Sequence, residues 1–133
     1  MEPPDQRFKL SDNAFRKVLD REVFASGTVI FKQGQDAARA YILPRGEVEI
    51  STVSADGKPI VLTTVKQGQF FGELALMSAS QRTATAIART ECEVLYIGQD
   101  KLKEKLDAAD PFLRYWIQYL SQRVIDLSKR VKV

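Results

Sequence analysis

The chain has 133 residues, of which 44% are hydrophobic and 28% are charged, and its formal net charge is +3. This balance is typical of one globular domain with its own core and argues against a disordered chain. The sequence contains no histidine and one cysteine, Cys92, which excludes internal disulfides, Cys-rich zinc sites and mechanisms that rely on an imidazole.

Residues 1–10 contain two prolines and mixed charges, which predicts a flexible N-terminus without a signal-peptide pattern. No run in the chain approaches the roughly 18 apolar residues of a membrane-spanning helix. We therefore expect a cytoplasmic protein that does not bind a membrane. Ser11 is suited to cap a helix over residues 11–22, with Ala14, Phe15 and Val18 on one face.

Residues 23–97 have the pattern of an antiparallel β domain. Val48, Ile50 and Thr52 alternate with charged or polar neighbours, as in a half-buried strand. Asp56-Gly57 predicts a hairpin turn, and Pro44 predicts a strand edge or a bulge. Six short runs are rich in β-forming residues: 28–31, 41–43, 47–53, 60–65, 84–88 and 93–97. Many short strands at this spacing favour a sandwich, roll or barrel.

Residues 99–133 predict two helices, a short one over about 101–109 and a longer one to about residue 132. Asp110 is a suitable N-cap, and Pro111 fits the first turn of the second helix. The apolar stripe of this helix is longer than the end of a barrel needs. Residues 112–133 hold five cations against one anion. A basic tail can bind nucleic acid, but cations also complement the C-terminal end of a helix dipole, and we favour that interpretation.

The segment 71–84 carries the chemistry. Gly72 allows an unusual backbone angle or a close approach. Residues 74–77 can form one helical turn, whose free N–H groups bind anions. Arg82 can supply a fork of donors to a phosphate. A carboxylate such as Glu73 is unexpected beside a site for a plain phosphate. It is explained if the ligand also presents a hydroxyl that donates to the carboxylate, and a ribose 2′-OH next to a phosphate meets this requirement.

The run Phe71-Gly72-Glu73-Leu74-Ala75-Leu76, followed by Arg82-Thr83-Ala84, resembles the phosphate-binding cassette of cyclic nucleotide-binding domains. Such domains occur in the protein kinase A regulatory subunit, cyclic nucleotide-gated channels and the catabolite activator protein. The resemblance covers nearly the whole chain, since four further segments look like the family's strand and turn patterns: Gly34-Gln35, Ala40-Tyr41-Ile42-Leu43, Gly46-Glu47-Val48 and Gly68-Gln69-Phe70.

The resemblance implies an α+β domain over residues 11–133. Its core is an eight-stranded antiparallel β-roll, similar to a jelly roll, over residues 23–97. An N-terminal helix over 11–22 precedes the roll, and a short helix lies in the cassette, 71–84. Two helices over 99–133 follow, and the last of them acts as a lid.

The resemblance also implies residue roles. Glu73 binds the ribose 2′-hydroxyl, Arg82 binds an exocyclic phosphate oxygen, and the Thr83 hydroxyl helps to hold cGMP in the syn form. The phosphate site includes Gly72, Leu74, Ala75, Thr83 and Ala84, with the amides of Leu74, Ala75 and Thr83 as donors. The base and sugar pocket includes Ile50, Thr63, Val65 and Phe71, and Arg123 and Leu127 cap the base. Two alternatives stay open: Arg82 and Glu73 form a structural ion pair, or Thr83 is a strand residue without a ligand role.

For the whole chain we expect a sensor for cAMP or cGMP that needs no cofactor or metal. The absence of histidine and of a recognisable catalytic arrangement argues against an enzyme. The sensor binds no nucleic acid directly and signals to an unknown protein partner through its terminal helices. The alternative is a sensor fragment of a larger transcription regulator, kinase or ion channel. A transcription regulator requires a helix-turn-helix, and the 133 residues end without one.

Overall fold

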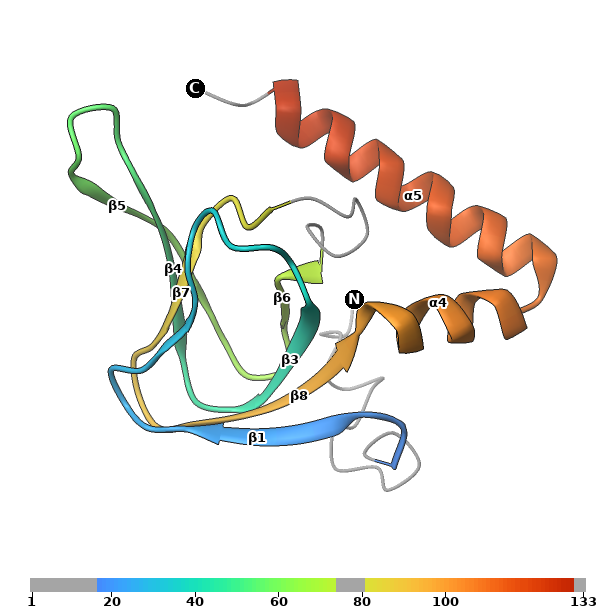
Figure 1. The fold of residues 1–133 in the computed structure, drawn as a ribbon, viewed down its shortest axis with the longest axis horizontal. Helices are drawn as coiled ribbons and strands as arrows, with labels where there is room; N and C mark the ends of the chain where they lie inside the picture. Colours follow the sequence, from blue (N-terminus) through green and yellow to red (C-terminus); the bar gives the residue numbers. More distant parts are fainter. Residues whose placement is uncertain (1–16, 74–80, 131–133) are drawn as a thin grey trace, which may run out of the picture.

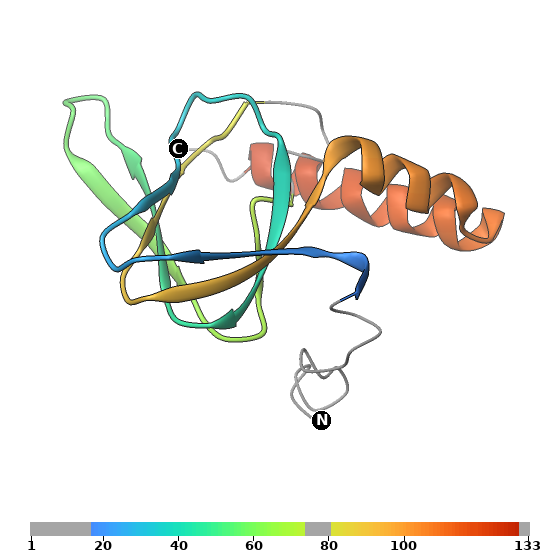
Figure 2. The ribbon, with the colours of Figure 1, turned by 60° about the horizontal axis from the view of Figure 1, so that its bottom comes forward.

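The computed structural model describes residues 17–73 and 81–130, and within them eight strands form two antiparallel sheets. One sheet has the order β1-β8-β3-β6 and the other β2-β7-β4-β5. The strands are β1 (Asp20–Phe24), β2 (Val29–Phe31), β3 (Arg39–Arg45), β4 (Val48–Val53), β5 (Pro59–Val65), β6 (Phe70–Phe71), β7 (Thr85–Ala88) and β8 (Cys92–Gly98). The sheets wrap around a common interior, with the helices together on one side (Figures 1 and 2). This arrangement confirms the predicted β-roll.

The core lies between the two sheets. Leu43 on β3, Val48 on β4 and Val94 on β8 are completely buried in one cluster. Burial of each such side chain contributes about 1.5–3 kcal/mol. On β4 the next inward residue, Ile50, packs against this cluster, as the predicted alternation requires. The two sheets therefore share one hydrophobic core.

The hairpin between β4 and β5 turns where the sequence predicts. The Ser54 amide donates to the Lys58 carbonyl at 2.8 Å, and the Gly57 amide donates to the Ser54 carbonyl at 2.9 Å. Gly57 has a φ of 83°, which glycine adopts without steric cost. The side chain of Asp56 accepts a hydrogen bond from the Ser54 hydroxyl. Asp56-Gly57 thus forms the turn of this hairpin.

The predicted N-terminal helix is wrong at its C-terminal end. Only Lys17 and Val18 are helical among its described residues, and Asp20 already begins β1. Residues 11–16 lie outside the described part. β1 pairs with β8 along its whole length, from Asp20 opposite Tyr96 to Phe24 opposite Cys92. Pairing with a strand so distant in sequence overrides the local helical pattern.

The pairing of β3 is irregular on both of its sides. On one side lies β6, which has only two residues, opposite Tyr41 and Ile42, and which lies outside the six predicted β-rich runs. On the other side the pairing with β8 shifts between Ile42 and Arg45, around Pro44. Because a proline has no N–H for the ladder, this irregularity accommodates it. The irregularity falls where the sequence predicts a strand edge or a bulge.

The chain continues into α4 (Gln99–Ala108) and α5 (Pro111–Arg130). The carboxylate of Asp110 accepts from the amides of Phe112 and Leu113 at 2.9 and 3.4 Å, which confirms the predicted cap. Within residues 17–73 and 81–130, no helix combines the length and the apolar character needed to cross a membrane.

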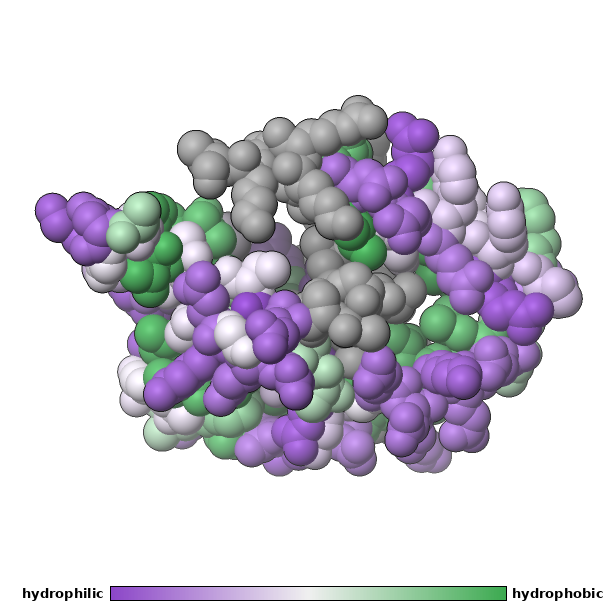
Figure 3. All heavy atoms as spheres, turned by 45° about the horizontal axis from the view of Figure 1, so that its top comes forward, coloured by the Kyte–Doolittle hydropathy of each residue, from purple (hydrophilic) through white to green (hydrophobic). Residues whose placement is uncertain are grey.

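Most of the exposed large apolar side chains lie on α5 and at the β4–β5 hairpin. On α5, Phe112 is 68% exposed, and Trp116 and Leu127 are each 50% exposed. Figure 3 shows apolar side chains gathered on the left, at the β4–β5 hairpin, where the exposed residues are Val53, Ile60, Val61 and Leu62. The apolar stripe of α5 is therefore not buried against the roll in this structure.

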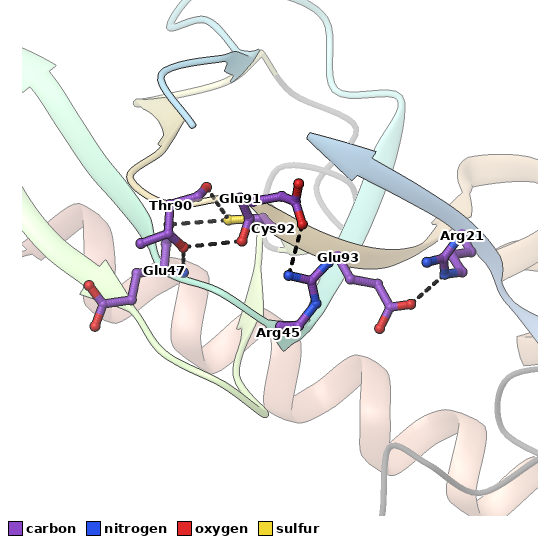
Figure 4. A network of polar contacts seen from close by, with 7 residues as sticks. All are labelled: Arg21, Arg45, Glu47, Thr90, Glu91, Cys92 and Glu93. Atoms are coloured by element: carbon purple, nitrogen blue, oxygen red, sulfur yellow. Dashed lines mark hydrogen bonds and ion pairs between the residues drawn. The ribbon is translucent and has the colours of Figure 1, made fainter. Parts of the chain in front are cut away.

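The turns between β3 and β4 and between β7 and β8 pack tightly against each other (Figure 4). Gly46 has a φ of 107°, and a Cβ there would lie 2.7 Å from both the Cys92 Sγ and the Glu91 carbonyl. The Thr90 hydroxyl accepts from the Glu47 amide at 3.1 Å. Cys92 is fully buried, and its Sγ lies 3.2 Å from the Glu47 carbonyl. Cys92 is therefore part of the packing of these turns.

Two ion pairs link side chains on or beside the strands near these turns. Arg45 pairs with Glu91 at 3.1 Å, and Arg21 on β1 pairs with the buried Glu93 on β8 (Figure 4). Exposed pairs contribute little to stability, typically about 0–1 kcal/mol. The pair of Arg21 and Glu93 joins the edge strand β1 to its neighbour β8.

Candidate functional site

The predicted cassette begins at the end of β6 and ends at the start of β7. Phe71, Gly72 and Glu73 are described on its first side, and residues 81–84 on its second side. Residues 74–80 lie outside the described part, and with them the predicted helical turn and the amides of Leu74 and Ala75. The geometry of the site is therefore given by residues 71–73 and 81–84.

Arg82 joins these two sides. Its side chain is buried, with 5% of the residue exposed. Nη1 donates to the Gly72 carbonyl at 2.7 Å, and Nη2 donates to the Arg39 carbonyl at 2.5 Å. The guanidinium is thus held between the end of β6 and the start of β3. A guanidinium has more N–H groups than these two bonds use, so it can still bind an anion.

The backbone of Arg82 is held as firmly as its side chain. Its amide donates to the Gln35 carbonyl at 2.7 Å, and its carbonyl accepts from the Gly34 amide at 2.8 Å. Asp36 and Gln81 form a β-bridge beside them. Sequence reasoning does not assign this role to the turn at Gly34, although a φ of 90° there favours glycine. This turn positions the arginine from outside the cassette.

Gly72 meets the expectation of an unusual backbone angle, with a φ of 75°. A Cβ on this residue would lie 2.7 Å from Arg82 Nη1 and 3.2 Å from Phe31 Cε2. The close approach that requires glycine here is therefore that of the guanidinium.

The electrostatics of the site are dominated by the buried guanidinium. Burial lowers the pKa of Arg82, while Tyr41 and Glu73 act in the opposite direction. Burial also raises the pKa of Tyr41, against the influence of the nearby Arg39 and Arg82. Because an arginine side chain remains protonated in proteins, the site carries a positive charge and favours anions.

Glu73 is half-buried and directly follows Gly72. Both Glu73 and Arg82 are described, and no ion pair joins their side chains. The alternative of a structural ion pair between them is therefore not supported. The described residues also contain no group of His, Cys, Asp and Glu side chains that could hold a metal ion.

The residues predicted to line the base and sugar pocket fall into two sets. Ile50 on β4 is half-buried and lies opposite the exposed Thr63 on β5. Val65 and Phe71 are instead buried in the core. Phe71 stacks on Tyr41, with ring centroids 4.8 Å apart. The structure thus brings Ile50 and Thr63 together across two strands, whereas Val65 and Phe71 pack in the core.

The remaining predicted residues lie just before β7 or on α5. Thr83 is exposed and Ala84 is buried, immediately before β7. On α5, the Arg123 Nη1 donates to the Tyr119 hydroxyl at 3.3 Å, and its guanidinium lies 5.8 Å from the centre of that ring. Leu127, four residues further on, is half exposed. Arg123 is thus engaged within its own helix.

Comparison with known proteins agrees with the resemblance for most of the chain. Residues 21–109 match the family model described as the cyclic nucleotide-binding domain. A cAMP-dependent protein kinase regulatory subunit from Pyricularia oryzae is 32% identical over 109 residues, covering 82% of this chain and 26% of the relative. The cAMP-activated global transcriptional regulator CRP of Haemophilus influenzae is 29% identical over 109 residues, covering 81% and 49%.

Among solved structures, the N-terminal domain of a transcriptional regulator from Streptomyces coelicolor A3(2) is similar in fold. It has a TM-score of 0.72 at 24% identity, covering 95% of this chain and 92% of that one. The chain therefore spans between about a quarter and half of the length of the two curated relatives, and nearly all of this solved domain.

Proposed function

The chain belongs to the family of cyclic nucleotide-binding domains, and we propose that it binds cAMP and cGMP and signals by rearrangement of its terminal helices. The observation that carries the proposal is Arg82, a buried cation held by two backbone carbonyls beside a glycine-dependent turn. A fixed, buried guanidinium is suited to a phosphate. The names of both curated relatives refer to cAMP, which supports the choice of ligand.

In this proposal, Arg82 binds an exocyclic oxygen of the cyclic phosphate, and the Glu73 carboxylate accepts a hydrogen bond from the ribose 2′-hydroxyl. The amides of Leu74, Ala75 and Thr83 complete the phosphate site. The base and sugar contact Ile50 and Thr63, which lie opposite each other, while Val65 and Phe71 support the pocket from the core. The domain catalyses no reaction and needs no metal or cofactor.

The signal in this proposal leaves through α5. Its large apolar residues are exposed, so packing against the roll does not fix the helix in the structure described. A bound base offers the Arg123 guanidinium a stacking surface in place of Tyr119, and offers Leu127 an apolar contact. A ligand shifts this equilibrium only by its greater affinity for the closed form.

A second candidate is a sensor fragment of a larger transcription regulator, kinase or ion channel. Its support is the limited coverage of the curated relatives, 26% and 49% of their lengths. Both candidates use the same ligand site. They differ in the downstream partner that responds to ligand binding, and this partner is a protein of unknown identity. The cytoplasmic location stays a prediction of the sequence.

The test of the proposed function is a thermal unfolding series with cAMP, cGMP and linear 5′-AMP. Ligand at about 100 times its dissociation constant should raise the free energy of unfolding by about 2.7 kcal/mol through mass action. At the same concentration, the cyclic compounds should stabilise the protein more than 5′-AMP does, because the phosphate of 5′-AMP is not closed into a ring. No stabilisation by either cyclic compound would remove the basis of the proposal.

Replacement of Thr83 by alanine separates the two ligands. In the proposed complex, its hydroxyl meets the 2-amino group of a syn guanine, which cAMP lacks. Thr83→Ala should therefore weaken cGMP binding by about 1 kcal/mol and leave cAMP binding nearly unchanged. Isothermal titration with both nucleotides measures the difference. An equal loss for both would place the hydroxyl on the phosphate, and no loss for either would show that Thr83 has no ligand role.

Removal of residues 122–133 tests the lid. The truncation should weaken cAMP binding roughly tenfold, mainly through faster dissociation, because one cation–π contact and one apolar contact are lost. The roll should stay folded, since the core cluster lies in the strands. In the intact protein, hydrogen exchange over residues 120–130 should slow when cAMP binds. Unchanged exchange together with unchanged affinity would show that α5 is not a lid.

A further inference from the structure

Arg82 brings a positive charge into the interior of the roll, and among the described residues it forms no ion pair with a carboxylate. A buried charge is unfavourable unless other groups compensate it. The carbonyls of Gly72 and Arg39 accept two hydrogen bonds from the guanidinium. N–H donors lie in the plane of a guanidinium, so these bonds leave its flat face to be stabilised by another group.

Phe31 covers this face. The Arg82 Cζ lies 4.0 Å from the centre of the Phe31 ring, well within the range of a cation–π interaction. The corresponding distance to the Tyr41 ring is 6.0 Å, at the limit of that range. Of these two aromatic residues, Phe31 is therefore the one in close contact with the guanidinium.

The ring of Phe31 is itself fixed by its neighbours. It stacks with Tyr41 and Phe71 at centroid distances of 5.9 and 6.2 Å, and all three rings belong to the core cluster. A Cβ on Gly72 would lie within 3.2 Å of both the ring and the guanidinium. Phe31, Gly72 and Arg82 thus form one closely packed unit at the start of the cassette.

From this geometry we infer that Phe31 is a positioning residue for the phosphate of the ligand. The two carbonyls fix the direction of the guanidinium within its plane, and the Phe31 ring fixes the plane itself. A guanidinium held in this way presents its free donors to the phosphate without first losing side-chain freedom. The inference rests on the proposed function, because Phe31 acts on the ligand through Arg82.

The test combines binding and stability measurements on Phe31→Leu, which keeps an apolar side chain but removes the aromatic face. Phe31→Leu should weaken cAMP binding by roughly 5- to 30-fold. The matched control is Phe24→Leu, because Phe24 also packs against the core but lies on β1, in the other sheet. This control should change the affinity by less than about twofold, since the guanidinium of Arg82 stacks on Phe31 and, within the described part of the chain, Phe24 has no cation–π contact with it.

Two readouts separate positioning from a general loss of structure. In the unmodified protein, NMR signals of the Arg82 side chain should show the upfield shift of protons above an aromatic face. In the protein without ligand, a double-mutant cycle of Phe31→Leu and Arg82→Met should show a coupling of roughly 3- to 30-fold in the unfolding equilibrium constant. Both readouts are independent of ligand binding.

Equal affinity of Phe31→Leu and the unmodified protein for cAMP would overturn the inference, and so would additive effects in the cycle or an unshifted Arg82 signal. Failure of the unmodified protein to bind either cyclic nucleotide would overturn the proposed function instead. In that case, the NMR shift and the unfolding cycle still decide whether Phe31 holds the guanidinium.

Discussion

Replacement of Arg82 by alanine is expected to weaken cAMP binding by about 2–5 kcal/mol, a larger effect than we expect for Glu73 or Thr83. The ligand phosphate would lose its main cationic partner in a buried site. The loss should appear mostly as faster dissociation, because truncation of one partner of a buried charge pair acts on that rate. Isothermal titration and stopped-flow dissociation measure the two quantities.

The same substitution should also destabilise the protein without ligand. The carbonyls of Gly72 and Arg39 each accept a hydrogen bond from the guanidinium and would lose it. Each buried acceptor left unsatisfied costs about 1–3 kcal/mol, reduced where water replaces the donor. The affinity of Arg82→Ala must therefore be measured at a temperature where the variant is shown to be folded by circular dichroism.

Gly72→Ala provides a second variant that keeps the charge of Arg82. Its Cβ would meet Nη1 at 2.7 Å, and its φ of 75° is strained for alanine, so the guanidinium must move. Binding of cAMP should weaken although the arginine is still present. Affinities of both Arg82→Ala and Gly72→Ala close to that of the unmodified protein would show that the phosphate binds elsewhere.

The parts of the fold that can be predicted from the sequence depend on neighbouring residues. The alternation along β4, the Asp56-Gly57 turn and the Asp110 cap all arise from local backbone geometry. The local pattern extends a helix into the first residues of β1, whose strand character comes instead from pairing with β8. The two-residue β6 is likewise defined only by its partner β3.

The candidate site shows the same limit. Arg82 and Gly72 can be identified from their spacing in one segment. The groups that hold Arg82 cannot, because Phe31, Gly34 and Arg39 lie on β2, the following turn and β3. Phe31 and Arg39 meet the guanidinium, and Gly34 meets the backbone carbonyl of Arg82, only in the folded domain. The apolar stripe of α5 can be predicted as well, but its exposure in the folded domain cannot.

Replacement of Glu73 by alanine is expected to weaken cAMP binding by about 1.5–3 kcal/mol, the value of one hydrogen bond to a charged group. This loss should nearly disappear with 2′-deoxy-cAMP, because that ligand lacks the hydroxyl that is proposed to donate a hydrogen bond to Glu73. Glu73 forms no ion pair with Arg82, and both residues lie in the described part, so its removal should leave the guanidinium in place.

Glu73→Gln is the matched control, since it keeps the size of the side chain and one acceptor oxygen but removes the charge. It should lose less affinity for cAMP than Glu73→Ala does, because a neutral acceptor still forms a bond, although a weaker one. Titration of all three proteins with cAMP and 2′-deoxy-cAMP gives a double-mutant cycle between the carboxylate and the hydroxyl. If Glu73→Ala weakens both ligands equally, the carboxylate does not contact the sugar, and its role is to shape the turn after Gly72.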